Sequence, residues 1–191
     1  SYDERLFRET MDDCVARLGF EATVVSVCLP FLAEVGVLWL TNSICPANEH
    51  FMSNLLRQML YAQIHEAEVP EDEGGEVLVL YLPEREIHDI SLLFVHQLCR
   101  SHGRKSVLLG QSVPFDDLPG VAAQFPKVAF VTYCTTSPAE HQVEAYIDRI
   151  ARTFGGSDVT FYLAGNVFRG AEPREGVTID VTGGELVQRL F

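Results

Sequence analysis

The sequence has few basic residues and no long apolar run, and each absence excludes a class of function. Its 191 residues include 14 Lys and Arg against 27 Asp and Glu, a net charge of −13. Such a chain repels nucleic-acid phosphates, so we expect it not to bind DNA by itself. No apolar run approaches the roughly 18 residues of a membrane span, and residues 1–5 do not resemble a signal peptide. We therefore expect a cytoplasmic protein with no membrane partner.

Several motifs of known chemistry are also missing. None of the five cysteines forms a Cys-x-x-Cys pair, which argues against a zinc site and a disulfide framework. Reduced thiols buried as small core residues are the simplest expectation. The sequence contains no Gly-x-Gly-x-x-Gly, no Walker loop and no Gly-x-Ser-x-Gly. Nucleotide binding by these loops and hydrolysis at a nucleophile elbow are therefore not expected.

What is present is a change of pattern near residue 76. Residues 1–67 carry apolar side chains at helical spacing, with a stop expected at Gly19 and an interruption at Pro30. Pro46 suits the first turn of a further helix, where its missing N–H costs nothing. Residues 68–75 are acidic and rich in Pro and Gly, which indicates an exposed linker.

From residue 76 to the end, short apolar runs alternate with helical stretches. The runs expected to form strands are 77–82, 106–109, 128–133, 159–163 and 177–181. The stretches expected to form helices are 87–101, 115–125 and 139–154, and 109–114 reads as a strand-to-helix loop. Alternation of this kind predicts a parallel sheet covered on both faces. The fold class is therefore α/β, a helical-bundle cap at 1–67 followed by a Rossmann-like, flavodoxin-type domain at 76–191.

Two spaced motifs carry the functional signal. Trp39 stands ten residues before the pair Glu49 and His50, and the triplet from Glu86 to His88 follows the first predicted strand. Ligands of parallel sheets bind beyond the carboxyl ends of the strands, which is where His88 is expected. In order and separation the motifs resemble a B12-binding module, most closely the effector half of MerR-type transcriptional regulators. The resemblance covers the chain from about residue 5 to the end.

The resemblance implies a role for the pair Glu86 and His88. In the family, this histidine replaces the benzimidazole of cobalamin as the lower axial ligand of cobalt, so His88 is the candidate metal ligand. Glu86 would accept the other ring N–H and select the tautomer. Taken by itself, the spacing favours a solvent-facing or capping histidine at a helix start, and the motif at Trp39, Glu49 and His50 reverses this preference.

Other positions match the family's pocket for the nucleotide tail of cobalamin less closely. Ser91 stands where the family has glycine, and its side chain could crowd the tail or bind it. Thr132 matches a hydroxyl residue at the end of the third strand. Ala164 and Gly165 match a Gly-Gly element with one glycine lost. The resemblance makes all four candidate cofactor-binding residues.

Trp39, Glu49 and His50 correspond to the residues that close over the upper face of the corrin ring. An indole offers a flat apolar surface, although a lone Trp is also a common core anchor of a helical bundle. Neighbouring helical residues differ in direction by about 100°, so we expect only one of Glu49 and His50 to contact a given ligand group. Light-sensing members have a histidine where this chain has Leu40, so strong light control is not expected.

The resemblance implies a ligand-sensing and oligomerisation half of a MerR-type regulator, with cobalamin or another corrinoid as cofactor and no enzyme activity. A homo-oligomer is expected, with DNA bound only through an N-terminal helix-turn-helix that this chain does not contain. Two alternatives stay open. One is a corrinoid-shuttle domain of a methyltransferase system, and the other is a degenerate dimerisation module that binds no B12.

Overall fold

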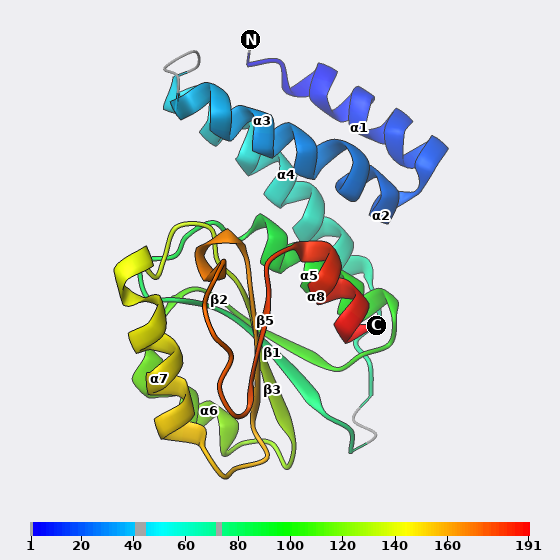
Figure 1. Ribbon diagram of the computed structural model, residues 1–191. Helices are drawn as coiled ribbons and strands as arrows, with labels where there is room; N and C mark the ends of the chain where they lie inside the picture. Colours follow the sequence, from blue (N-terminus) through cyan, green and yellow to red (C-terminus); the bar gives the residue numbers. More distant parts are fainter. Residues whose placement is uncertain (1, 41–44, 72–73) are drawn as a thin grey trace. The chain divides into compact units, whose positions relative to one another are not determined.

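The chain forms two compact units, Ser1–His65 and Glu66–Phe191 (Figure 1). The computed structural model describes residues 2–40, 45–71 and 74–191, apart from the side chains of Val37, Trp39 and Leu40. The first unit is helical and the second contains the sheet, in the predicted order. The boundary between the two units lies just before residue 67, where the sequence predicted the end of the helical region.

The helical unit is built from amphipathic and apolar helices joined by short connections. They are α1 (Glu4–Leu18), α2 (Phe20–Thr23), the π-helical turn η1 (Val24–Cys28), α3 (Leu29–Leu40) and α4 (Pro46–Glu66). The carboxylate of Asp3 accepts a 2.9 Å hydrogen bond from the backbone N–H of Leu6 and so caps α1. Gly19 ends this helix with a φ of +81°, as its position in the sequence predicted. The ring of Tyr2 packs edge-on against Phe51 of α4, with centroids 5.2 Å apart.

Pro30 does not interrupt the second helical stretch, so that prediction was wrong in position. The chain stays helical through Pro30, and the irregular turn is η1, which lies before it. There the backbone N–H of Leu29 bonds to the carbonyl of Val24, five residues back. Pro30 has no N–H to offer the preceding turn, and a widened π turn accommodates that loss without breaking the helix.

The second unit is a parallel sheet with the strand order β2-β1-β3-β4-β5, in which every neighbouring pair is parallel. This is the flavodoxin-type order, and it confirms the predicted fold class. The strands are β1 (Val77–Pro83), β2 (Ser106–Val113), β3 (Val128–Tyr133), β4 (Thr160–Ala164) and β5 (Val177–Asp180). The helices are α5 (Ile90–Ser101), α6 (Leu118–Ala122), α7 (Val143–Phe154) and α8 (Gly183–Leu190), with short 3₁₀ turns at Phe115–Asp117, Glu140–Gln142 and Asn166–Phe168.

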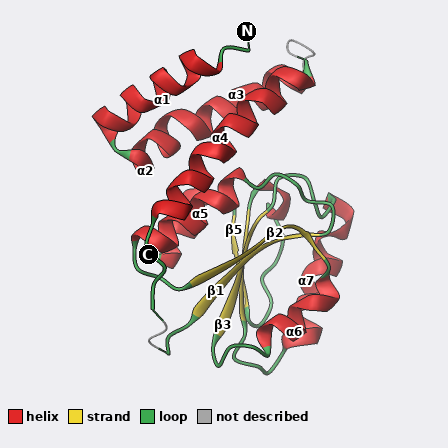
Figure 2. Ribbon diagram, turned by 180° about the vertical axis from the view of Figure 1, so that it is seen from behind, coloured by secondary structure: helices red, strands yellow, loops and turns green. Residues whose placement is uncertain are grey.

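Helices cover both faces of the sheet (Figure 2). Alternate residues of β1 enter different clusters, so that Val79 faces α6 and α7 while Leu80 faces α5 and α8. Both faces of β1 and β3 are buried, which explains why these strands appear in the sequence as continuous apolar runs.

Two elements differ from their predicted limits, and both border the loop that contains His88. Strand β2 does not stop at residue 109 but continues to Val113, through Gly110 at a φ of +85° and Ser112 at +54°. Its register against β1 shifts there, as in a bulge. Helix α5 begins at Ile90 rather than at residue 87, because the three residues before it belong to the loop after β1.

The C-terminal helix α8 was not predicted. Its signal is a capping box in which the side chain of Thr182 accepts from the backbone N–H of Glu185, whose carboxylate accepts from the N–H of Thr182. The apolar residues Leu186 and Leu190 then pack on the sheet. Arg189 adds a double hydrogen bond to the buried carboxylate of Asp180.

A substitution at Gly165 tests how closely the backbone segments at the ends of β3 and β4 must approach each other. Its φ is +115°, and a Cβ at this position would overlap the backbone carbonyl of Cys134. We expect Gly165→Ala to lower the free energy of unfolding in urea by roughly 3 kcal/mol or more, from backbone strain and steric overlap. The control is Gly120→Ala in α6, where the added Cβ meets no atom within 4 Å; it should change stability by no more than about 1 kcal/mol. Equal stability of the two variants would contradict this account.

Candidate functional site

The loop between β1 and α5 lies at the point where the strand order reverses. Neighbouring strands β1 and β3 leave the sheet at the same edge and connect to helices on opposite faces, which is where parallel sheets bind ligands. Glu86 sits in this loop with no exposed surface, and its backbone N–H donates to the carbonyl of Pro83 over 3.0 Å. A buried carboxyl at this edge requires specific partners.

The carboxylate of Glu86 accepts hydrogen bonds from two loops. Oε1 accepts from the backbone N–H groups of Ile87 and His88, both at 3.0 Å. Oε2 accepts from three successive N–H groups in the loop after β3, those of Thr135 at 2.9 Å, Thr136 at 2.6 Å and Ser137 at 2.8 Å. One side chain therefore ties the loop after β1 to the loop after β3.

These contacts keep Glu86 ionised although it is buried. Burial acts to raise the pKa of Glu86, but the hydrogen bonds from the His88 side chain and from the backbone of Thr136, Ser137 and His88 outweigh it. The net result is a pKa well below the ordinary value of a glutamate. The site thus contains a fixed negative charge.

The imidazole of His88 is oriented by this charge. Its Nδ1 lies 2.6 Å from Oε1 of Glu86 and 3.4 Å from the hydroxyl oxygen of Thr136. An ionised carboxylate only accepts hydrogen bonds, so Nδ1 carries a proton, and in the neutral imidazole the lone pair is then on Nε2. About half of the His88 side chain, 48%, is exposed, whereas Glu86 is buried beneath it. The pair thus has the arrangement of a histidine ligand with a carboxylate behind it.

Strand β2 supports the same loop from its other side. The hydroxyl of Ser112 accepts from the backbone N–H of Arg85 at 3.0 Å, and the N–H of Ser112 donates to the carbonyl of Glu86 at 3.2 Å. The side chain of Gln111 donates to the buried carboxylate of Asp89 over 2.6 Å. The extension of β2 past residue 109 is what brings these groups to the loop.

The four residues predicted for the nucleotide tail do not lie in one place. Ser91 is half-buried in the first turn of α5. Thr132 and Ala164 are both fully buried, but Thr132 lies on the α7 side, with its hydroxyl 3.4 Å from the Cys134 sulfur, whereas Ala164 packs on the α5 and α8 side. Glycine is needed at position 165 because a Cβ there would overlap the backbone of Cys134. The structure therefore does not bring Thr132 and Ala164 together, and their role as tail contacts stays a prediction.

The upper-face motif lies in the helical unit. Trp39 belongs to α3, and its side chain, like that of Leu40, lies outside the described residues. Glu49 and His50 are in the first turn of α4, and Nδ1 of His50 is 3.0 Å from Oε2 of Glu49. The flexible glutamate side chain thus turns toward the neighbouring ring. That only one of the two contacts a given ligand group stays a prediction.

Sequence reasoning missed the residues that hold Glu86 and the rest of its loop in place. These are Thr135, Thr136, Ser137, Gln111 and Ser112. The available signal was the polar run after β3, at the same edge of the sheet as Glu86. The bonds come mostly from backbone N–H groups, which every residue type carries, so side-chain identity could not reveal them.

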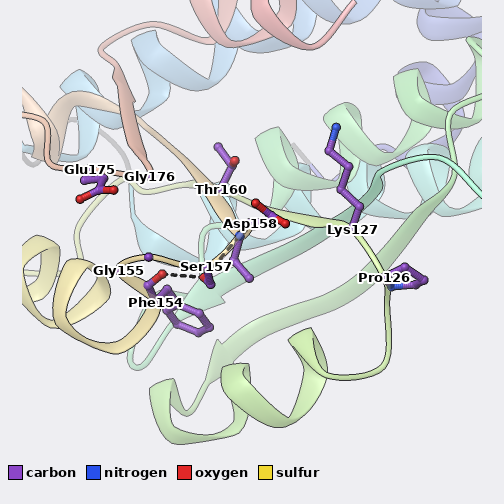
Figure 3. Close-up of a pocket in the computed structure, with 11 residues that line it drawn as sticks. Pro126, Lys127, Phe154, Gly155, Ser157, Asp158, Thr160, Glu175 and Gly176 are labelled. Atoms are coloured by element: carbon purple, nitrogen blue, oxygen red, sulfur yellow. Dashed lines mark hydrogen bonds between the residues drawn. The ribbon is translucent and has the colours of Figure 1, made fainter.

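A pocket of about 550 Å³ lies at the opposite edge of the sheet (Figure 3). Its lining comes from the segments that precede strands, including Lys127 before β3, Asp158 before β4 and Gly176 before β5. His88 follows the carboxyl end of β1, so this pocket is separate from the Glu86 site. No predicted site residue lines it.

The donor set around His88 fits a metal that arrives with its own ligands. In residues 2–40, 45–71 and 74–191, no three His, Cys, Asp or Glu side chains are placed to hold a metal ion together. One imidazole cannot satisfy a free divalent ion, which takes four or more ligands. It can supply a single axial nitrogen to a cobalt ion held in a macrocycle. The residues present therefore fit a corrinoid.

Comparisons with known proteins lead to the same cofactor class. Residues 1–62 match the family model described as B12 binding domain. The curated HTH-type transcriptional repressor CarH of Myxococcus xanthus is 31% identical over 152 residues, which are 80% of this chain and 49% of the relative. The helical part of the chain, residues 1–62, therefore matches the B12-binding domains. This family supports cobalamin, a corrinoid, as the cofactor of the chain.

The extent of each match limits what it shows. The chain spans about half the length of the curated relative, 49%. Among solved structures, the monomethylamine corrinoid protein of Methanosarcina barkeri superposes with a TM-score of 0.73 at 16% identity, covering 95% of this chain and 88% of that one. That likeness confirms the fold. None of the helices in the described part of this B12-binding chain has the length and apolar composition to cross a membrane.

The Glu86 carboxylate should make stability depend on pH in acid. Because its pKa is lower in the folded chain than in the unfolded chain, it stabilises the fold above its ordinary pKa near 4.5, and this contribution is lost as the pH falls below that value. We expect Glu86→Gln to cost about 3 kcal/mol of unfolding free energy at pH 7, with a difference from wild type that shrinks toward pH 3. Urea unfolding across this range measures it, with exposed Glu84→Gln as control. A pH-independent difference would contradict the assignment.

Proposed function

We propose that this chain is the corrinoid-sensing part of a transcriptional regulator and that His88 is the lower axial ligand of cobalt. The observation that carries the ligand assignment is the 2.6 Å contact between Nδ1 of His88 and the buried, ionised Glu86. The regulator assignment is supported by 31% identity to the repressor CarH over most of the chain. The chain would act by binding a ligand, without catalysing a reaction.

The protein's contribution is to present one imidazole in one orientation and one protonation state. A bound corrinoid supplies a cobalt centre with an exchangeable upper ligand. Glu86 holds the proton on Nδ1 of His88, which keeps the lone pair of Nε2 available for the metal. The bonds from Thr135, Thr136 and Ser137 keep Glu86 from rotating. Nε2 is thereby pre-positioned before any ligand arrives.

The upper side of the ligand is assigned to Trp39, Glu49 and His50 on sequence grounds. The contact between Glu49 and His50 supports treating these two as a unit, in which the carboxylate holds the Nδ1 edge of the imidazole. Ser91, Thr132, Ala164 and Gly165 stay the predicted neighbours of the nucleotide tail. Leu40 cannot coordinate a metal, so strong light control is not proposed.

Signal output is proposed to pass through self-association. Regulators that read paired half-sites act as symmetric oligomers. With a net charge of −13, the chain would leave DNA contacts to another segment of the regulator. The ligand would then change the equilibrium between assembly states through its different affinity for each.

The second candidate function is a corrinoid shuttle for methyl transfer. It is favoured by the shared fold with the monomethylamine corrinoid protein, at a TM-score of 0.73. A shuttle and a sensor can use the same lower ligand. They differ in whether cobalamin changes the assembly state of the chain.

Replacing His88 tests the ligand assignment. Wild-type chain mixed with hydroxocobalamin should show the visible spectrum of cobalamin whose benzimidazole is replaced by a protein imidazole. His88→Ala should lose this spectrum, and Glu86→Gln should weaken binding by about 10- to 100-fold, as expected of a residue that orients a metal ligand. The control is His102→Ala, at the far end of α5. An unchanged spectrum in His88→Ala would rule out this residue as the ligand.

Assembly state separates the sensor from the shuttle. We expect light scattering coupled to size exclusion to show a higher assembly state with adenosylcobalamin than without it. The His88→Ala chain should not change its assembly state when the cofactor is added. If cobalamin binds through a protein imidazole, as its spectrum reports, but the oligomeric state of the chain is the same with and without cofactor, the shuttle is favoured. Salt-dependent retention of the chain on duplex DNA would contradict the proposal that another segment of the regulator makes the DNA contacts.

A further inference from the structure

A buried cysteine, Cys28, contacts a methionine of α1 within the helical unit, and a second cysteine, Cys14, lies one turn along the same helix. Met11 and Cys14 are three residues apart on α1 and therefore share one face of that helix. Cys28 ends the π-helical turn η1 on the segment that returns after Gly19. Its thiol contacts the thioether of Met11, with the two sulfur atoms 3.9 Å apart.

This separation is the one that a shared metal ion requires. Metal–sulfur bonds of roughly 2.3 Å place the sulfurs of a three-coordinate site about 4 Å from each other. Met11 and Cys28 already have this spacing without a metal. Cys14 adds a third sulfur from the position one helical turn beyond Met11.

The Cys14 thiol is close enough to affect the ionisation of Cys28. Burial, with a smaller contribution from the neighbouring Cys14, raises the pKa of the Cys28 thiol to about 11. Cys28 is buried and Cys14 half-buried. Without a cation, the Cys28 thiol therefore keeps its proton at neutral pH. A metal ion that binds thiolate strongly enough can displace it.

The donor set selects the kind of ion. Thiolate and thioether sulfurs are soft ligands and prefer soft cations such as Cu(I). In the described part of the chain, no third His, Cys, Asp or Glu joins the two cysteines to make a metal cluster. Structural zinc sites are four-coordinate and built from such residues. Two thiolates and one thioether instead suit an ion of low coordination number.

We propose that Met11, Cys14 and Cys28 form a binding site for Cu(I) within the helical unit. On binding, the S–H bonds of Cys14 and Cys28 each release a proton to water, and two copper–sulfur bonds form. The Met11 sulfur donates a lone pair as the third ligand. Copper enters and stays as Cu(I), so no electron is transferred. The site is independent of the corrinoid function.

The helix geometry supports a built site. A π turn places one additional residue in a helical turn, and such turns are frequent at functional sites. Here the turn ends at Cys28 and directs this side chain toward α1. Since the segment stays helical through Pro30, the sulfur is held between two helical elements.

The test is competition for Cu(I) with the chelator bicinchoninate, under argon, on the reduced, corrinoid-free chain. Wild type should withdraw one Cu(I) per chain from the coloured chelate, release two protons and gain ultraviolet thiolate-to-copper absorption. Cys14→Ser and Cys28→Ser should lose this ability. Met11→Leu, which keeps the side-chain volume, should retain the absorption and bind more weakly. The control is Cys45→Ser, an exposed cysteine of the same unit, which should match wild type.

Two further measurements keep the result decisive. Because a serine at a buried position could disturb packing, Cys28→Ala is tested beside it, with circular dichroism to confirm helix content. A folded Cys28→Ala chain that withdraws copper as well as wild type would overturn the site. So would a wild-type chain that leaves all copper on the chelator. Neither outcome bears on cobalamin binding, which is measured separately by its visible spectrum.

Discussion

A single buried carboxylate organises the sheet domain at its functional edge. Glu86 accepts backbone hydrogen bonds from the loop after β1 and from the loop after β3, and it also contacts the imidazole of His88. Burying this charge is costly, but the number and short length of the bonds offset the cost and hold its pKa low. Because both loops converge on one group, the position of His88 depends on the strand order.

Strand β2 completes this arrangement from the edge of the sheet. The bulge after Gly110 lets Ser112 bond to the backbone N–H of Arg85 and to the backbone carbonyl of Glu86. It also lets the side chain of Gln111 donate a hydrogen bond to Asp89. Three neighbouring strands therefore support one imidazole. This explains how the side chain of a loop residue can be held in one orientation: its partners lie at or just after strand ends, and the loop itself is short.

The helical unit contributes a different kind of chemistry. It carries the match to the B12-binding family at residues 1–62 and the motif residues Trp39, Glu49 and His50. It also brings Cys28 into contact with Met11, one turn from Cys14 on α1. The two groups of residues differ in whether the sequence alone reveals them. The first motif is visible as a fixed spacing, whereas the sulfur cluster joins residues on different helical elements and has no spacing to search for.

The sequence by itself determined the fold class, the helical and sheet halves, and the candidate pair Glu86 and His88. It could do so because apolar periodicity reports burial directly, and because both members of the pair lie in one short loop. Only the tertiary structure decided the bonds from Thr135 to Ser137, the continuation of β2 through Ser112, and the separation of Thr132 from Ala164 onto opposite faces. Those depend on which strands are neighbours and on backbone N–H groups that all residues share, and neither is encoded in local residue type.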